Sequence, residues 1–170
     1  ERALLRLAQE GHILVAANYR LGIFGWLALP VLRAADPRGT AGNYGITDQQ
    51  QALKWVSHHV AAFGGDPGRV TIMGQSSGGT NVYAHLASAG SKGLFAAAIG
   101  LSGSPNISMS QPNKEAQDTK LWLPSTPCAN ASTEQLLQCL HTADAGELLR
   151  SIPKKYETFT FADKYDLCEE

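Results

Sequence analysis

The chain has 170 residues, of which 44% are hydrophobic and 17% are charged, and its formal net charge is −1. This length supports one ordinary domain with a hydrophobic core, and this composition excludes a disordered chain. The scattered charges give no footprint for nucleic acid or for an anionic membrane surface, and no apolar stretch approaches the length of a membrane span. We therefore expect neither nucleic acid nor a membrane as a partner.

The first part of the chain predicts a helix, a strand and a second helix. Glu1–Gln9 carries an amphipathic helical pattern, and the chain opens inside it without Met or a signal peptide, which predicts an internal fragment. The apolar run in His12–Tyr19 predicts a strand buried on both faces. A connection containing Gly, Pro and Arg follows from Arg20 to Gly45. Ile46–Ala62 then has helical periodicity, with Asp48 placed to favour its N-terminal turn.

Two further strands with a helix between them follow. Val70–Met73 and Leu94–Leu101 predict buried strands, and Thr80–Ser88 predicts the helix between them. This strand–helix rhythm is typical of a parallel sheet with crossover helices, which places the chain in the α/β class. After Ser102 the chain becomes polar and rich in Pro up to Pro127. Two short helices are then expected, at Ser132–His141 and Ala145–Ser151.

Three cysteines and two glycosylation sequons favour the secretory route. Cys128 and Cys139 flank a polar stretch and are candidates for a local disulfide, whereas Cys168 has no evident partner in the sequence. Asn-X-Ser sequons occur at Asn106 and Asn130. We therefore expect a secreted protein or one of the secretory pathway.

The segment Gly74-Gln75-Ser76-Ser77-Gly78 matches the nucleophile-elbow pattern G-x-S-x-G. A serine on a sharp strand-to-helix turn adopts a strained backbone with φ > 0, and we expect Gly74 and Gly78 because side chains there would clash. The following helix directs its N–H groups at the reacting centre, so the backbone N–H of Ser77 is placed to stabilise an oxyanion. The alternatives are a turn without chemistry, or a phosphate loop. The latter is disfavoured because no Lys follows the glycines.

The run FGGDPGRVTIMGQSSGG, from Phe63 to Gly79, closely resembles the serine signature of the type-B carboxylesterases, the group that includes cholinesterases and related lipases. The resemblance extends from about Gly11 to Arg150. It includes the segments Asn18–Gly22, Phe24–Leu27, Gly42–Gly45, Asp48-Gln49, Ala52-Leu53, Trp55-Val56, Gly93–Phe95 and Ser102–Asn106.

This resemblance implies part of an α/β-hydrolase fold, a mostly parallel sheet with helices on both faces, with residues 1–170 forming a single partial domain. It implies a serine hydrolase of carboxylic esters in which Ser76 is acylated and the Ser77 N–H binds the oxyanion. Cys128 and Cys139 look like the family's small-loop disulfide. The implied substrate is a small-molecule or lipid ester, with no cofactor and no metal. Gln75 stands where relatives usually carry Glu, which disfavours choline esters.

The rest of the catalytic machinery is expected outside the chain. In this fold the order is Ser, acid, His. His85 follows Ser76 on a helix that leads away from the turn, and His141 precedes any plausible acid loop, so both are interpreted as surface or packing residues. The second oxyanion loop is expected upstream, and the acid and His beyond Glu170. Adjacent His58 and His59 point about 100° apart on a helix and do not form a metal-chelating pair.

Two other interpretations stay open at this stage. The parent protein could be a non-catalytic cholinesterase-like module used in adhesion, although such relatives usually lack the serine. The 170 residues could also be an inactive remnant. Without the rest of its sheet such a remnant would expose an apolar edge and aggregate.

Overall fold

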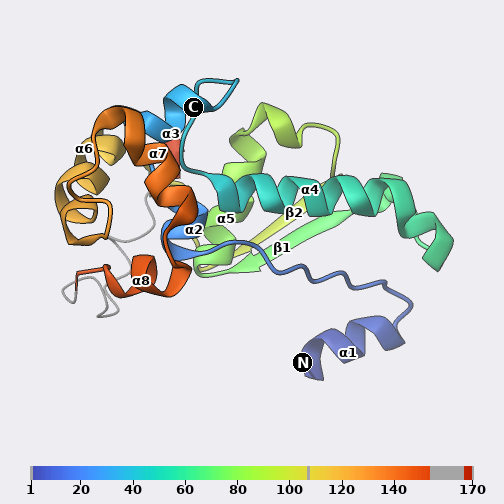
Figure 1. Cartoon of the computed structure of the whole chain (residues 1–170). Coiled ribbons are helices and arrows are strands. Elements are labelled where there is room, and N and C mark those ends of the chain that lie inside the picture. The colour runs from blue at the N-terminus through green and yellow to red at the C-terminus, as the bar shows by residue number, and fades with distance from the viewer. Residues whose placement is uncertain (1, 107, 154–166, 170) are drawn as a thin grey trace. The chain divides into compact units, whose positions relative to one another are not determined.

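The computed structural model describes residues 2–106, 108–153 and 167–169 (Figure 1). The chain divides into two compact units. Unit 1 contains residues 1–20 and 45–105, and unit 2 contains residues 21–44 and 106–170. That residues 1–170 form one partial domain stays a prediction.

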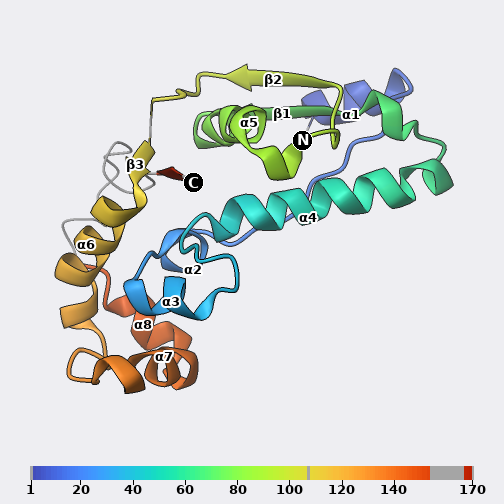
Figure 2. The same cartoon turned by 90° about the horizontal axis from the view of Figure 1, so that it is seen from above.

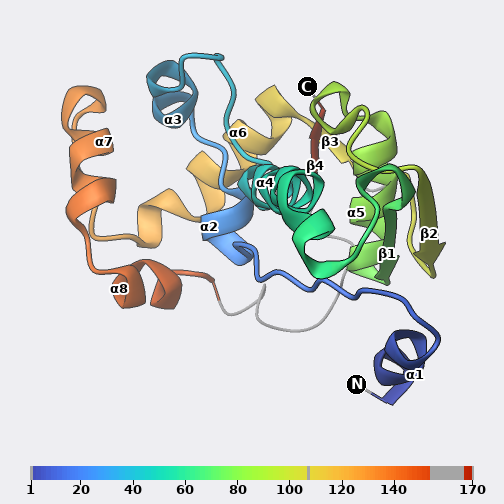
Figure 3. The same ribbon diagram turned by 90° about the vertical axis from the view of Figure 1, so that its right-hand side faces the viewer.

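Unit 1 is built around two parallel strands, β1 (Thr71–Gln75) and β2 (Ala97–Leu101). The helix α5 (Ser77–Ala87) connects them together with the short 3-10 helix η3 (Ala89–Ser91). As Figures 2 and 3 show, α5 lies between the two strands and α4 (Tyr44–His59). The predicted strand–helix–strand crossover with a parallel sheet is confirmed.

Only one face of this two-stranded sheet is covered by α5. On the covered face, Gly100 faces the ring of Tyr83 from α5, where an added Cβ would lie 3.4 Å from the ring. On the opposite face, Met73, Ile99 and Leu101 are 49%, 45% and 48% exposed. The expectation of helices on both faces is therefore met on one face only within the part of unit 1 that the structure describes.

The expected strand at His12–Tyr19 is not formed. After α1 (Arg2–Gln9), residues 12–20 run without regular secondary structure, and Ile13, Leu14 and Val15 are all more than 40% exposed. A strand requires a hydrogen-bonded neighbour, and β1 pairs with β2 alone among the described residues. The apolar run supplies the tendency to be buried but no partner for its backbone.

The helix expected at Ile46–Ala62 is confirmed as α4, followed by the 3-10 helix η1 (Val60–Phe63). Gly64 ends it with φ 85°, the left-handed conformation that glycine adopts without steric cost. Asp48, however, is the fifth residue of α4 and not in its first turn. Its carboxylate instead accepts hydrogen bonds from the Arg20 backbone N–H, Nε and Nη2 at 2.9, 2.8 and 2.7 Å, and Arg20 lowers the pKa of Asp48.

Unit 2 is mostly helical. Its helices are α2 (Gly22–Trp26), α3 (Pro30–Ala35), α6 (Gln111–Leu121), α7 (Thr133–Thr142) and α8 (Ala145–Arg150), with the 3-10 helix η4 (Leu123–Ser125) after α6. The predictions of α7 and α8 are confirmed, and Ser132 and Asp144 cap their N-termini. The helices α2 and α3 lie in a region expected to be a connection, and α6 lies in a region expected only to be polar.

The core of unit 2 combines apolar packing with buried charge. Leu29, Trp122 and Leu148 form a buried hydrophobic cluster. Beside it, the buried Asp118 carboxylate pairs with Lys114 and accepts the Ala28 backbone N–H at 2.8 Å. Burial raises the pKa of Asp118, and the contact with Lys114 only partly offsets that effect. Charged residues therefore occupy interior positions that a hydrophobicity pattern would not assign to the core.

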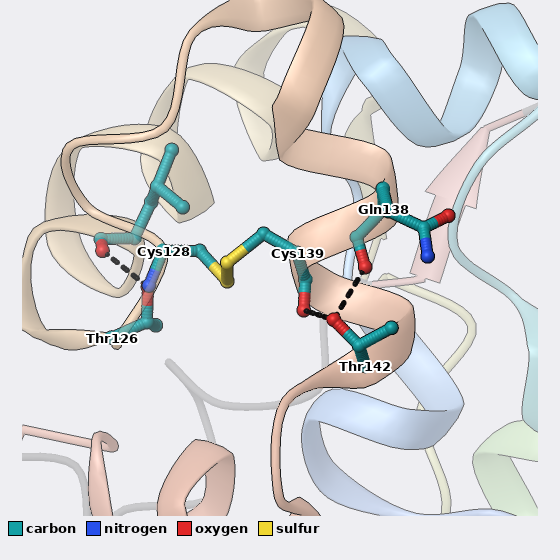
Figure 4. The surroundings of a disulfide bond; sticks show 6 residues. Thr126, Cys128, Gln138, Cys139 and Thr142 are labelled. Carbon is teal, nitrogen blue, oxygen red and sulfur yellow. Dashed lines mark hydrogen bonds between the residues drawn. A yellow bond between two sulfur atoms is a disulfide. The ribbon is translucent and has the colours of Figure 1, made fainter.

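The disulfide between Cys128 and Cys139 is present and joins the segment before α7 to α7 itself (Figure 4). Cys128 is 1% exposed, and its N–H donates to Thr126 Oγ1 at 3.2 Å. On the other side, the Thr142 hydroxyl contacts the backbone carbonyls of Gln138 and Cys139 at 2.9 and 3.3 Å. The candidate pairing is therefore confirmed.

The backbone of Cys168 lies in β4 (Leu167–Glu169), which pairs in parallel with β3 (Ser108–Ser110). Cys168 lies opposite Met109 in this register. Its side chain is outside the described part of the structure.

Candidate active site

Ser76 lies at the junction of β1 and α5, with φ 56° and ψ −122°. A positive φ costs a non-glycine residue free energy and persists only where neighbouring structure enforces it. Two backbone hydrogen bonds do so here. The Ser76 N–H donates to the Leu101 carbonyl at 2.8 Å, and the Ser76 carbonyl accepts from the Thr80 N–H at 3.0 Å. The turn thus has the strained strand-to-helix geometry expected of a nucleophile elbow.

The glycines around Ser76 have unequal roles. A Cβ on Gly74 would collide with the backbone of Gly78, so glycine is required at position 74. A Cβ on Gly78 would meet no atom within 4 Å, so the expectation that both positions exclude side chains is wrong for Gly78.

The close approach falls one residue later, at Gly79. An added Cβ there would lie 2.9 Å from the Leu101 carbonyl oxygen and 3.0 Å from the Gly103 N. A Cβ on Gly103 would in turn collide with the Gly79 backbone. The first turn of α5 therefore packs directly on the backbone that follows β2. The G-x-S-x-G pattern alone does not predict this contact.

Ser77 is the first residue of α5. The N–H groups of the first helical turn have no partner within the helix and carry the positive end of the helix dipole. The Ser77 N–H therefore belongs to the donors that such a helix start presents to an anion. Because the donor is in the backbone, its position depends on the placement of α5 and not on the serine side chain.

Ser102 is a residue of this site that sequence reasoning missed. It follows β2 directly and has φ 53°, so two adjacent parallel strands both end in a serine with a left-handed backbone. The following loop is held to α5, since the Ser104 N–H donates to Thr80 Oγ1 at 3.2 Å. The signals for it in the sequence were a Ser-Gly pair directly after a predicted strand and the family resemblance of the segment Ser102–Asn106.

His85, which was interpreted as a surface or packing histidine, is a packing residue that is 5% exposed. Its Nδ1 contacts Ser91 Oγ at 2.8 Å and its Nε2 contacts Gln49 Oε1 at 2.9 Å. Burial lowers the pKa of His85. Both ring nitrogens are thus engaged away from Ser76. His12, His58 and His59 in unit 1, and His141 in unit 2, are exposed.

Within the described residues, no group of three or more His, Cys, Asp or Glu side chains is arranged to hold a metal ion. Across the same part of the chain, no helix combines the length and the apolarity needed to cross a bilayer. An open hollow of about 570 Å³ lies in unit 2 between the start of the disulfide segment and α8, and it includes none of the elbow residues.

Both sequon asparagines are exposed. Asn130 lies between Cys128 and α7, and the sequon's hydroxyl residue is Ser132, whose Oγ accepts the Gln135 N–H at 3.3 Å. The sequon at Asn106 includes residue 107, which lies outside the described residues.

Comparison with known proteins identifies the family. Residues 4–166 match the carboxylesterase family. A cholinesterase of Mus musculus is 38% identical over 84% of this chain and 23% of its own length, and esterase E4 of Myzus persicae is 38% identical over 90% and 26%.

Among solved structures, a PNB esterase superposes with a TM-score of 0.73 at 33% identity, covering 90% of this chain and 31% of that one. The chain thus has part of an α/β-hydrolase fold and spans about a quarter of the length of these curated relatives. The chain belongs to the carboxylesterase family.

Proposed function

We propose that the protein containing this segment hydrolyses carboxylic esters through an acyl-enzyme on Ser76. The observation that carries this proposal is the strained backbone of Ser76 between β1 and α5, in a chain that belongs to the carboxylesterase family. The alternative of a non-catalytic adhesion module has no comparable observation in its favour, because the serine and its turn are intact.

The proposed reaction has two steps. In the first, Ser76 Oγ attacks the ester carbonyl while a histidine from outside these 170 residues takes the hydroxyl proton. The developing oxyanion accepts a hydrogen bond from the Ser77 N–H, and the alcohol leaves with the proton. In the second, water gives its proton to the same histidine and attacks the acyl-enzyme, which releases the acid and restores Ser76. The 170-residue segment alone is therefore expected to be inactive.

A second proposal concerns the substrate class. We propose a small-molecule or lipid ester, and a preference for neutral over choline esters because Gln75, at the exposed end of β1, carries no charge to attract a cationic head group. Relative hydrolysis rates of matched choline and neutral esters test this, and a clear choline preference contradicts it.

We further propose that the protein enters the secretory pathway. The Cys128–Cys139 disulfide is of a kind that persists in oxidising compartments, and the exposed Asn130 beside it offers a glycosylation site, with Asn106 as a second. A mobility shift on glycosidase treatment that becomes smaller in Asn130→Gln supports the assignment, and a glycan-free protein that stays in the cytosol contradicts it.

The test of the main proposal is steady-state hydrolysis of p-nitrophenyl esters by the full-length protein. Ser76→Ala should lower kcat by about a thousandfold or more, because it removes the nucleophile. Ser57→Ala, an exposed serine on α4, is the matched control and should leave kcat unchanged. Equal rates for Ser76→Ala and the control would contradict the proposal.

A further inference from the structure

His85 lies in a buried polar network that no proposed catalytic step uses. The network joins α5 to α4 through Gln49, and to η3 through Ser91, which is 1% exposed. Gln50, the next residue on α4, donates from Nε2 to Ser88 Oγ and Ser91 Oγ at 3.0 and 3.1 Å. Three segments of unit 1 therefore meet at one imidazole.

Burial lowers the pKa of His85 and so favours a neutral ring, and the hydrogen-bond partners then assign its single proton. Because Gln49 Oε1 only accepts, His85 Nε2 carries the proton, and Nδ1 then accepts from the Ser91 hydroxyl. The Ser91 oxygen is in turn the acceptor for Gln50. The Gln49 Nε2 group on the same amide is buried without a hydrogen-bond partner, so Gln49 is bound in this network through its oxygen alone. Burial disfavours a second proton on the ring.

This network lies on the helix that carries the proposed oxyanion donor. His85 is nine residues beyond Ser76, about 13 Å along a helix axis. Nearer the elbow, α5 is held by Thr80 through the Ser104 N–H and by Asn81, whose Nδ2 donates to the Tyr19 hydroxyl at 3.3 Å. The helix is thus fixed by polar contacts near both ends, and the contacts at its far end are those of His85 with Gln49 and Ser91 and that of its C-cap residue Ser88 with Gln50.

We propose that His85 is a positioning residue for ester hydrolysis, which fixes the axis of α5 and so aims the Ser77 N–H and Ser76 Oγ at the substrate carbonyl. This inference rests on the proposed function. A helix held only near its first turn can tilt, and a displacement of about 1 Å at a reacting group can lower a rate about a hundredfold. His85 acts through α5 and does not touch the substrate.

The test uses the full-length protein and normalises activity to the sites titrated by a fluorophosphonate. His85→Phe keeps a ring without polar atoms and should lower kcat per titrated site at least tenfold with KM little changed, since substrate contacts are intact. His85→Gln, which can still donate to Gln49, should recover most of that loss. Val56→Ala, which shortens a buried apolar side chain of α4 that takes no part in the network, is the control for destabilisation alone.

If His85→Phe fails to fold, Ser91→Ala removes the Nδ1 partner with a smaller change in volume and should lower kcat in the same direction. The inference is overturned if both variants keep the native kcat per titrated site, or if Val56→Ala lowers kcat as much as His85→Phe. Failure of the proposed function is a different result, because the native protein itself would then neither titrate nor hydrolyse esters.

Discussion

Each of the two compact units is stabilised internally by a different kind of interaction. In unit 1 the elbow depends on backbone contacts: Gly74 against Gly78, Gly79 against Gly103, and the Ser76 N–H bound to the Leu101 carbonyl. In unit 2 the structure depends on side chains, with a disulfide, a hydrophobic cluster and a buried ion pair. Substitutions at the elbow of unit 1 should therefore change chemistry, and substitutions in unit 2 should change stability with little effect on chemistry.

The largest effect on ester hydrolysis is expected from Gly74→Ala in the full-length protein, and it would sharpen this comparison. Its Cβ has no space beside the Gly78 backbone, so the elbow must open, at a cost of about 3 kcal/mol in the free energy of unfolding. Ester hydrolysis should be lost. Gly78→Ala is the matched control and should fold and hydrolyse esters, because its Cβ meets open space. Equal behaviour of the two variants would contradict this account of the turn.

In unit 2, Asp118→Ala should destabilise the protein without altering its chemistry. It leaves the Lys114 ammonium buried without its carboxylate and the Ala28 N–H without an acceptor, which costs about 3–5 kcal/mol. Denaturant unfolding measures the loss, and fluorophosphonate titration of the remaining folded protein gives kcat per site. A native-like stability, or a fall in kcat per site, would contradict the claim that this part of unit 2 contributes stability and not chemistry.

The double variant Cys128→Ala/Cys139→Ala should lower the free energy of unfolding by about 2–3 kcal/mol, because the closed loop is short. The kcat per titrated site should stay at its native value. Thermal unfolding of the variant and of the native protein, both under non-reducing conditions, provides the comparison. A loss of activity at unchanged stability would show that this disulfide positions the catalytic groups.

The smallest expected effect is on the pH dependence of the free energy of unfolding. Burial lowers the folded-state pKa of His85 below its ordinary value of about 6.5, so below that pH the unfolded chain binds more protons than the folded one. Stability from His85 is therefore complete above about pH 6.5 and falls as the pH drops through the folded-state pKa. His85→Gln should flatten this part of the profile. Identical profiles for native and variant protein would contradict the neutral ring.

The elbow is the part of the site that the sequence predicted best, because G-x-S-x-G after an apolar strand describes a local turn. Contacts between distant segments were not predictable in the same way. The roles of Gly79 and Ser102 depend on β2 lying beside β1, which places Gly103 against α5. The strand predicted at His12–Tyr19 is not formed for the same reason, because a strand needs a hydrogen-bonded neighbour and a local sequence pattern does not specify one.

Unit 2 was predicted only in part. The two short helices expected at Ser132–His141 and Ala145–Ser151 are α7 and α8, and the candidate disulfide between Cys128 and Cys139 is present. The helix α6 has a polar sequence, because its buried positions include Lys114 and Asp118, which pair with each other. A hydrophobic periodicity does not detect a helix whose interior face carries compensated charges.

The most direct test of the central claim is to locate the nucleophile chemically. The native full-length protein would be treated with a fluorophosphonate and digested, and the modified residue identified by mass spectrometry. The account predicts a single phosphonyl adduct on Ser76, absent after prior denaturation and absent in Ser76→Ala. An adduct on another residue, or none on well-folded native protein, would contradict it.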